Sequence, residues 1–181
     1  MRSKRILKLD KPLANFSVAV DTREKMPYVF KHQITAGLKQ GDYSLYITSE
    51  FAEKLKAESS FPARQIENGY ILDNFVAIER KRNTEELYSC CAGQRRRFEA
   101  ELARLAAVPH TLIICEFNFS EIDMLDIRVK LGARECVYGS ICSWIARYGT
   151  PFLFAGNRIL ARAATFTFLE KVIKNHFRFC F

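Results

Sequence analysis

Short apolar runs recur along the chain between longer segments in which apolar residues follow a helical period. Runs of this length, bounded by turn-forming residues, are typical of buried strands. The pattern predicts strands at residues 16–21, 43–47, 75–78, 111–116 and 151–154. The first of these strands ends on Asp21, and the third continues directly into Glu79-Arg80-Lys81. Charged side chains therefore follow buried strands at two places.

Amphipathic segments predict the helices. Asn83 is a plausible N-cap, with Glu86 three residues later as its capping-box partner. Gly93 interrupts this helix, and a second segment over residues 94–107 carries its large apolar residues on one face. Further helices are expected at residues 134–148 and from Asn157 to about Asn175.

Strands that alternate with helices predict an α/β fold with a mixed central β-sheet flanked by helices. We expect a basic N-terminal tail at residues 1–15 and a single domain over residues 16–181. A polar stretch without clear periodicity, at about 49–74, is interpreted as an insertion or long hairpin connection, with one helical turn near residues 52–57.

Composition allows a normal packed core in the 181 residues, because 49% are hydrophobic and 27% are charged. No run of 18 apolar residues exists, so no membrane span is expected. The basic N-terminus has no apolar stretch behind it, which argues against a secretory signal. We expect a cytoplasmic or nucleoid-associated protein.

Cysteine and histidine do not point to a metal centre. The six cysteines form no C-x-x-C pair, and we predict that they are buried, reduced thiols. A zinc site or a nucleophile–histidine arrangement needs a nearby histidine, and the three histidines (His32, His110 and His176) are scattered in the sequence. No Gly-rich phosphate loop is present, so no small-molecule cofactor is expected.

The net charge of +8, from 28 basic and 20 acidic residues, favours a polyanionic partner. The positive charge concentrates at residues 2–11, at residues 80–97 and along the final helix. Two interpretations of the basic start stay open: contact with a polyanion, or a tail without a role.

The segment Glu79-Arg80-Lys81 is the most informative for chemistry. On a strand, residues i and i+2 point to one face, so Glu79 and Lys81 face one way and Arg80 the other. A carboxylate there suits a divalent metal that polarises a phosphate and generates hydroxide. The lysine suits orienting or deprotonating the attacking water and stabilising the developing charge.

A hard cation needs a second carboxylate, and Asp42 at the mouth of a neighbouring strand is the candidate. Each feature alone has an ordinary explanation. An acid-x-lysine pair is common where a strand reaches solvent, and Asp42 after Gly41 is normal turn chemistry.

The features occur together, however, in three separated motifs: Val-Asp-x-Arg-Glu at 20–24, Gly-Asp-Tyr at 41–43 and Ile-Glu-Arg-Lys at 78–81. Arg97-Phe98 and Glu101-Leu102 follow on a predicted helix. Together they resemble the XPF-type nuclease domain, a branch of the PD-(D/E)-x-K superfamily. The resemblance runs from about Val18 to Glu116 and continues more weakly to Phe168.

The resemblance implies a restriction-endonuclease-like fold, Mg²⁺ or Mn²⁺ as cofactor, and incision near branches or single-strand junctions. By position it implies metal-binding carboxylates at Asp42 and Glu79, and a catalytic lysine at Lys81 with Arg80 before it. The first acidic motif of the family matches Asp21, Arg23 and Glu24.

The sequence departs from the family pattern in three ways. Glu85 stands where the family has an aspartate, and we regard it as a supporting acid. Gly93-Gln94 replaces Gly-Arg, and one of Arg95, Arg96 and Arg97 is expected to substitute for that arginine and bind phosphate, unless the cluster is an ordinary solvated face. We also expect no tandem helix-hairpin-helix module.

These observations predict a metal-dependent DNA endonuclease that acts on branched or junction DNA in repair or recombination. A non-catalytic DNA-binding subunit and an RNA-cutting relative are the alternatives, and retention of Asp42, Glu79 and Lys81 argues against the first. A homodimer or a DNA-targeting partner protein is also expected, because the final helix region carries more aromatic residues than one buried stripe accommodates. The alternative is that the last of these, Phe177, Phe179 and Phe181, fold back onto the domain.

Overall fold

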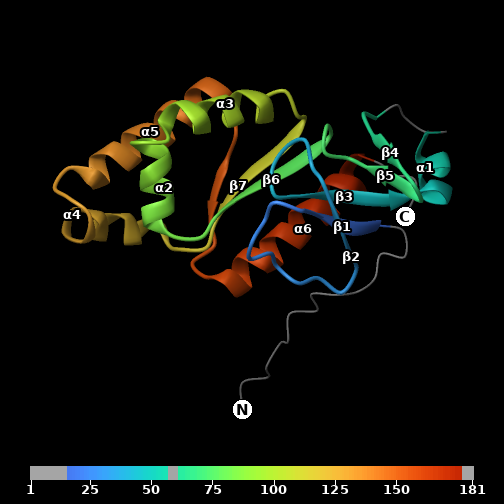
Figure 1. The fold of residues 1–181 in the computed structure, drawn as a ribbon, viewed down its shortest axis with the longest axis horizontal. Helices are drawn as coiled ribbons and strands as arrows, with labels where there is room; N and C mark the ends of the chain where they lie inside the picture. Colours follow the sequence, from blue (N-terminus) through green and yellow to red (C-terminus); the bar gives the residue numbers. More distant parts are fainter. Residues whose placement is uncertain (1–15, 57–60, 177–181) are drawn as a thin grey trace, which may run out of the picture.

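An eight-stranded mixed sheet forms the centre of the computed structural model, which describes residues 16–56 and 61–176 (Figure 1). The main path of the sheet has the order β2-β1-β3-β6-β7-β8. Its strands are β1 (Phe16–Asp21), β2 (Gln33–Ala36), β3 (Tyr43–Thr48), β6 (Val76–Lys81), β7 (His110–Cys115) and β8 (Phe152–Phe154). Strands β6, β7 and β8 are parallel, whereas β3 is antiparallel to both β1 and β6.

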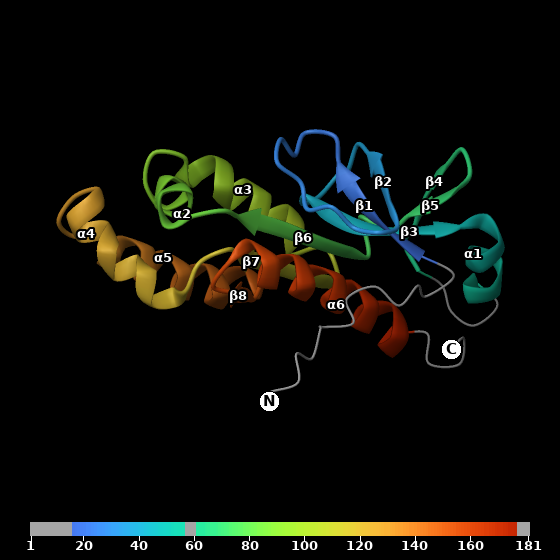
Figure 2. The same cartoon turned by 90° about the horizontal axis from the view of Figure 1, so that it is seen from below.

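Helices cover both faces of this sheet. They are α1 (Ser49–Lys56), α2 (Thr84–Cys91), α3 (Arg95–Leu105), α4 (Leu125–Arg128), α5 (Ala133–Tyr148) and α6 (Arg158–His176), with a 3-10 turn, η1 (Phe119–Met124), before α4. Helices α3 and α6 lie on opposite sides of β6 (Figure 2). The mixed sheet flanked by helices confirms the predicted fold class.

The alternation along β6 divides the core in two. Val76 and Ile78 join the apolar cluster that contains the buried residues of α6. Ala77 joins the second cluster, with the buried residues of α2, α3 and α5. Because the side-chain period of a strand is two, Glu79 and Lys81 extend the α2–α3 side, and Arg80 extends the α6 side.

Every strand and helix predicted from the apolar pattern is present, and the predicted N-cap is confirmed. The side chain of Asn83 accepts a hydrogen bond from the Glu86 N–H at 2.8 Å. The carboxylate of Glu86 accepts from the N–H of Arg82 at 2.9 Å, one residue before the expected partner.

The polar stretch after β3 holds more structure than the predicted single turn. It contains the whole of α1, followed by a hairpin of β4 (Arg64–Ile66) and β5 (Gly69–Ile71). Strand β5 pairs with β3, so the stretch extends the sheet. Strand β2 was also missed, because its residues alternate between exposed and half-buried and carry little apolar signal.

The prediction of buried thiols is correct for Cys90, Cys91 and Cys115, but Cys136 is only half-buried and Cys142 is exposed on α5. Cys180 lies outside the described residues. The histidines are not all scattered in space: the rings of His110 and His176 lie 6.2 Å apart, each edge-on to Phe75. Their separation of 66 residues in the sequence concealed this contact.

Among the described residues, no helix combines the length and apolarity that a bilayer crossing requires. In α6, Phe166 and Phe168 are partly buried against the core. Phe177, Phe179 and Phe181, like the basic residues 1–15, lie outside the described residues, and self-association remains a prediction.

Candidate active site

The turn before β3 places Asp42 against β6, the strand that carries Glu79 and Lys81. The Asp42 N–H donates to the carbonyl of Ile78 at 2.8 Å, and its carbonyl accepts from the Asp21 N–H at 2.9 Å. Gly41 makes this approach possible: its φ is +66°, and a Cβ there would lie 2.7 Å from the Ile78 carbonyl oxygen. The Gly-Asp motif therefore has a structural reason beyond turn formation.

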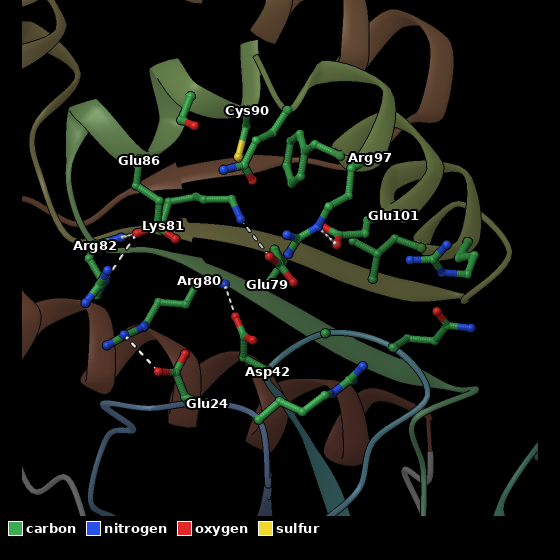
Figure 3. Close-up of a pocket in the computed structure, with 18 of the residues that line it drawn as sticks. Glu24, Asp42, Glu79, Arg80, Lys81, Arg82, Glu86, Cys90, Arg97 and Glu101 are labelled. Carbon is green, nitrogen blue, oxygen red and sulfur yellow. Dashed lines mark hydrogen bonds and ion pairs between the residues drawn. The ribbon is translucent and has the colours of Figure 1, made fainter. Parts of the chain in front are cut away.

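The side chains of Asp42, Glu79 and Lys81 converge at the end of β6 (Figure 3). Oδ2 of Asp42 accepts a hydrogen bond from the backbone N–H of Arg80 at 2.8 Å. The ammonium of Lys81 lies 2.6 Å from Oε1 of Glu79. The structure thus brings together the three residues that the sequence nominated for metal binding and catalysis.

Burial and neighbouring charges shift the pKa values of Asp42 and Lys81. Burial, and then repulsion by Glu79, raise the pKa of Asp42 well above its ordinary value. Burial alone would lower the pKa of Lys81, but the carboxylates of Glu79 and Asp42 outweigh it and raise that pKa. The ammonium also lies 4.5 Å from the centroid of the Phe98 ring. Lys81 is therefore a cation at neutral pH, although its side chain is only 5% exposed.

Arg80 faces the other side of β6, as predicted. Its guanidinium is 2% exposed and pairs with Glu24 at 3.1 Å and Glu116 at 3.0 Å. It does not share the face of Glu79 and Lys81. The backbone of Arg80 thus holds Asp42, and its side chain joins the segments that carry Glu24 and Glu116.

A cleft of about 670 Å³ opens over the carboxylates, between the loops before β3 and the helices α2 and α3 (Figure 3). Lysines and arginines outnumber acids along its walls. The basic residues that line it are Arg23, Lys25, Lys39, Arg80, Lys81, Arg82, Arg97 and Arg104. Such a charge distribution suits a polyanion that must approach two carboxylates.

The first acidic motif is divided between the cleft and the core. Arg23 and Glu24 line the cleft, but Asp21 does not. Asp21 is 2% exposed, and its carboxylate pairs with Arg23 at 2.6 Å and accepts from the Leu38 N–H at 3.3 Å. The strong hydrogen bonding lowers the pKa of Asp21 in spite of its burial. Asp21 therefore pairs with Arg23 beneath the surface and does not line the cleft.

The three consecutive arginines have different surroundings. Arg95 packs over Trp144 at 5.5 Å, donates to Ser140 at 2.8 Å and pairs with Glu99. Arg96 is exposed and does not line the cleft. Arg97 lines it, with its side chain 76% exposed and a 3.3 Å ion pair to Glu101. Arg97 is the member of the cluster that the structure places at the site.

Several cleft residues were missed, and Glu85, like Asp21, Arg95 and Arg96, was nominated but does not line the cleft. Glu85 lies outside the cleft, where it pairs with Arg128 at 3.7 Å, and Glu86 lines the cleft in its place. Arg104 lines the cleft two helical turns after Arg97, a spacing that the sequence could have revealed. Lys39 sits in a loop whose position no local pattern indicates.

The donor set fits a hard divalent cation. In the bonds above, Asp42 uses Oδ2 and Glu79 uses Oε1, which leaves each carboxylate a second oxygen as a ligand. Within the described residues, no three His, Cys, Asp or Glu side chains converge as metal ligands. Mg²⁺ is ordinarily held by one or two carboxylates with water and substrate phosphate, so a pair is sufficient. A cation would also offset the repulsion that raises the pKa of Asp42.

Solved structures with a similar fold are known. XPF from Aeropyrum pernix superimposes with a TM-score of 0.56 at 16% identity, over 85% of this chain. The same protein in complex with DNA gives a TM-score of 0.52 at 18% identity, over 90% of this chain. The chain has an XPF-type nuclease fold. It covers 60% and 63% of the two solved chains. No family model and no curated protein matches the sequence.

The XPF-type fold explains why the motifs lie where they do. The mixed sheet pairs β3 with β6 and so brings the Gly-Asp turn beside the Glu-Arg-Lys segment, although Asp42 and Arg80 are 38 residues apart in the sequence. At 16% and 18% identity the likeness establishes the fold.

Proposed function

We propose that the protein is a DNA endonuclease that depends on Mg²⁺ or Mn²⁺ and hydrolyses phosphodiester bonds. The observation that carries this proposal is the pairing of Lys81 with Glu79 at 2.6 Å, beside the carboxylate of Asp42, in a cleft with basic walls. DNA as the substrate is supported by the likeness to a solved XPF–DNA complex. Branched or junction DNA, in repair or recombination, is the finer form of the proposal.

Asp42, Glu79 and Lys81 would have different roles in the reaction. Asp42 and Glu79 would hold the cation, which when bound polarises the phosphate and lowers the pKa of a water ligand. Lys81 carries its charge at neutral pH, so it orients the attacking water and stabilises the charge that develops on the phosphate. Deprotonation of that water by Lys81 is the alternative role, and it would need a bound cation to offset the carboxylates that raise the pKa of the amine.

The cleft walls would hold the substrate by its backbone. Arg97 and Arg104 lie on α3, and Lys39 lies on the opposite loop, so phosphates can be bound on both sides of the carboxylates. Contacts of this kind add affinity without selecting a sequence. We therefore expect cleavage to depend on DNA structure more than on base sequence.

The test is incubation of the purified chain with linear, nicked, flapped, forked and single-stranded DNA, and with RNA, in Mg²⁺, Mn²⁺ or EDTA. We expect cleavage of at least one DNA substrate in either metal and none in EDTA. A Glu79→Gln variant, which keeps the size of the side chain, is expected to be inactive. Cleavage of RNA alone would favour the RNA-cutting alternative, and DNA binding without any cleavage would favour the non-catalytic one.

A further inference from the structure

Two arginines from distant parts of the chain share one carboxylate oxygen behind the cleft. Glu116 follows β7 and donates its N–H to the carbonyl of Lys81 at 2.9 Å. Its Oε1 accepts from Nη1 of Arg80 at 3.0 Å and from Nη1 of Arg158 at 3.1 Å. Arg158 is the first residue of α6. The start of α6 is thereby joined to the end of the strand that carries Glu79 and Lys81.

The same two guanidiniums hold the loop that follows β1. Both donate to the carbonyl of Met26 at 2.9 Å, and Arg158 also donates to the carbonyl of Pro27 at 2.7 Å. The two cations lie over the ring of Tyr28, at 5.4 Å for Arg80 and 5.0 Å for Arg158. Residues 26–28 continue directly from Arg23, Glu24 and Lys25, which line the cleft.

The position of Arg158 in its helix is unfavourable by itself. Asn157 caps the helix, with its side chain accepting from the Leu160 N–H at 2.9 Å. A cation in the first turn of a helix opposes the macrodipole, which favours acids there. The contacts to Glu116 and to the loop carbonyls compensate for this placement. A residue that breaks a local rule and gains distant partners is a candidate for a functional role.

We propose that Arg158 is a positioning residue for the active site. Together with Glu116, it holds the loop of residues 22–28 in place, so that Arg23 and Glu24 keep their positions along the cleft. The part of this inference that concerns cleavage rests on the proposed nuclease function. The part that concerns the loop does not.

The first experiment measures the loop without any reaction. Hydrogen exchange is followed at residues 22–28, where the N–H groups of Glu24, Met26 and Tyr28 are hydrogen-bonded. Arg158→Ala is expected to accelerate exchange there by roughly three- to tenfold, through easier local opening. Lys171→Ala is the matched control, because it removes one charge from an exposed position of the same helix. Unchanged exchange at residues 22–28 in Arg158→Ala would overturn the proposal.

Two further variants separate positioning from a general loss of stability. Arg158→Lys keeps the charge but loses the planar fork that reaches three acceptors, so it is expected to restore only part of the exchange protection. Glu116→Gln should accelerate exchange in the same segment, and adding it to Arg158→Ala should have less than the additive effect. Additive effects would mean that the two residues do not act through one network, against the proposal.

The second experiment uses the cleavage reaction. A positioning role predicts that Arg158→Ala lowers kcat by roughly tenfold, since small misplacements at a site are costly. The slope of log affinity against log salt should stay at the wild-type value. A slope lower by about 0.9 would instead make Arg158 a direct phosphate contact. If the wild type cleaves nothing, the nuclease proposal fails, while the exchange experiment still decides the role of Arg158.

Discussion

The carboxylate of Asp42 accepts a hydrogen bond from the backbone of Arg80 at 2.8 Å, across 38 residues of sequence. This bond fixes one proposed metal ligand beside the other, because Glu79 precedes Arg80 on β6. Only the backbone of Arg80 takes part in this bond. Its side chain lies on the opposite face of β6, where it pairs with Glu24 and Glu116. One residue thus ties together both sides of the strand that carries the site.

The first prediction is that Asp42→Asn stabilises the metal-free protein while abolishing cleavage. Asparagine can still accept from the Arg80 N–H, but it removes a charge that burial and Glu79 make unfavourable. In EDTA we expect Tm to rise by about 2–4 °C for each kcal/mol gained. Glu85→Gln, outside the cleft, is the control and should change neither Tm nor cleavage appreciably. A lower Tm for Asp42→Asn would contradict the electrostatic argument.

The same argument sets the sign of a pH effect in EDTA. Because the pKa of folded Asp42 is raised, the folded state binds this proton more tightly than the unfolded chain, whose aspartate titrates near pH 3.9. The contribution of Asp42 protonation to the free energy of unfolding is fully present below about pH 3.9. It is lost as the pH rises through the raised pKa of the folded state. Urea unfolding against pH should show this loss in the wild type relative to Asp42→Asn. Parallel pH profiles for the two proteins would refute it.

The second prediction concerns the arginines of α3. Replacing Arg97 and Arg104 by alanine should weaken binding to every DNA sequence and flatten the salt dependence by about 0.9 in log–log slope for each lost contact. Arg96→Ala is the matched control, since Arg96 is exposed on the same helix but does not line the cleft. Fluorescence anisotropy over a salt series measures both quantities. An equal loss of slope in the Arg96 variant would contradict the prediction that DNA binds on the cleft side of α3.

The third prediction concerns thiol reactivity. Burial raises the pKa of Cys91 to about 12, so this thiol should resist alkylation in the folded protein at pH 8. Cys142 is exposed and should be alkylated by iodoacetamide under the same conditions. Both should react after unfolding in urea, where a thiol titrates near pH 8.5. Peptide mass spectrometry follows each site, and equal alkylation rates in the folded protein would contradict the burial of Cys91.

The residues that local patterns could identify were those on a regular element. The period of two along β6 sufficed to place Glu79 with Lys81 and Arg80 opposite, because that geometry needs no knowledge of the rest of the fold. The helical period would likewise have found Arg104 from Arg97. Asp42 was placed beside this strand because a hard cation needs a second carboxylate, and the family resemblance matched the same residue; in the structure its carboxylate accepts from the Arg80 backbone N–H.

Other features depend on contacts between distant segments. Strand β2 and the β4–β5 hairpin are short and partly exposed, so their pairing with the sheet decides their structure more than their own propensity does. The contact of Arg158 with Glu116 spans 42 residues and leaves no trace in periodicity. The exposure of Cys142 depends on which face of α5 meets the core, and that helix has only a weak apolar stripe.

The most direct test of the active site is the single-turnover rate of DNA cleavage by the wild type and by Lys81→Ala, measured in Mg²⁺ on the substrate that the wild type cuts best. Removal of the Lys81 charge, which lies 2.6 Å from Glu79, should lower the rate by at least about 100-fold. DNA affinity should change by less than about threefold, because one charge among many contributes little to binding. A parallel loss of rate and affinity, or a variant that cleaves at the wild-type rate, would contradict the assignment of Lys81, Glu79 and Asp42 as the nuclease centre.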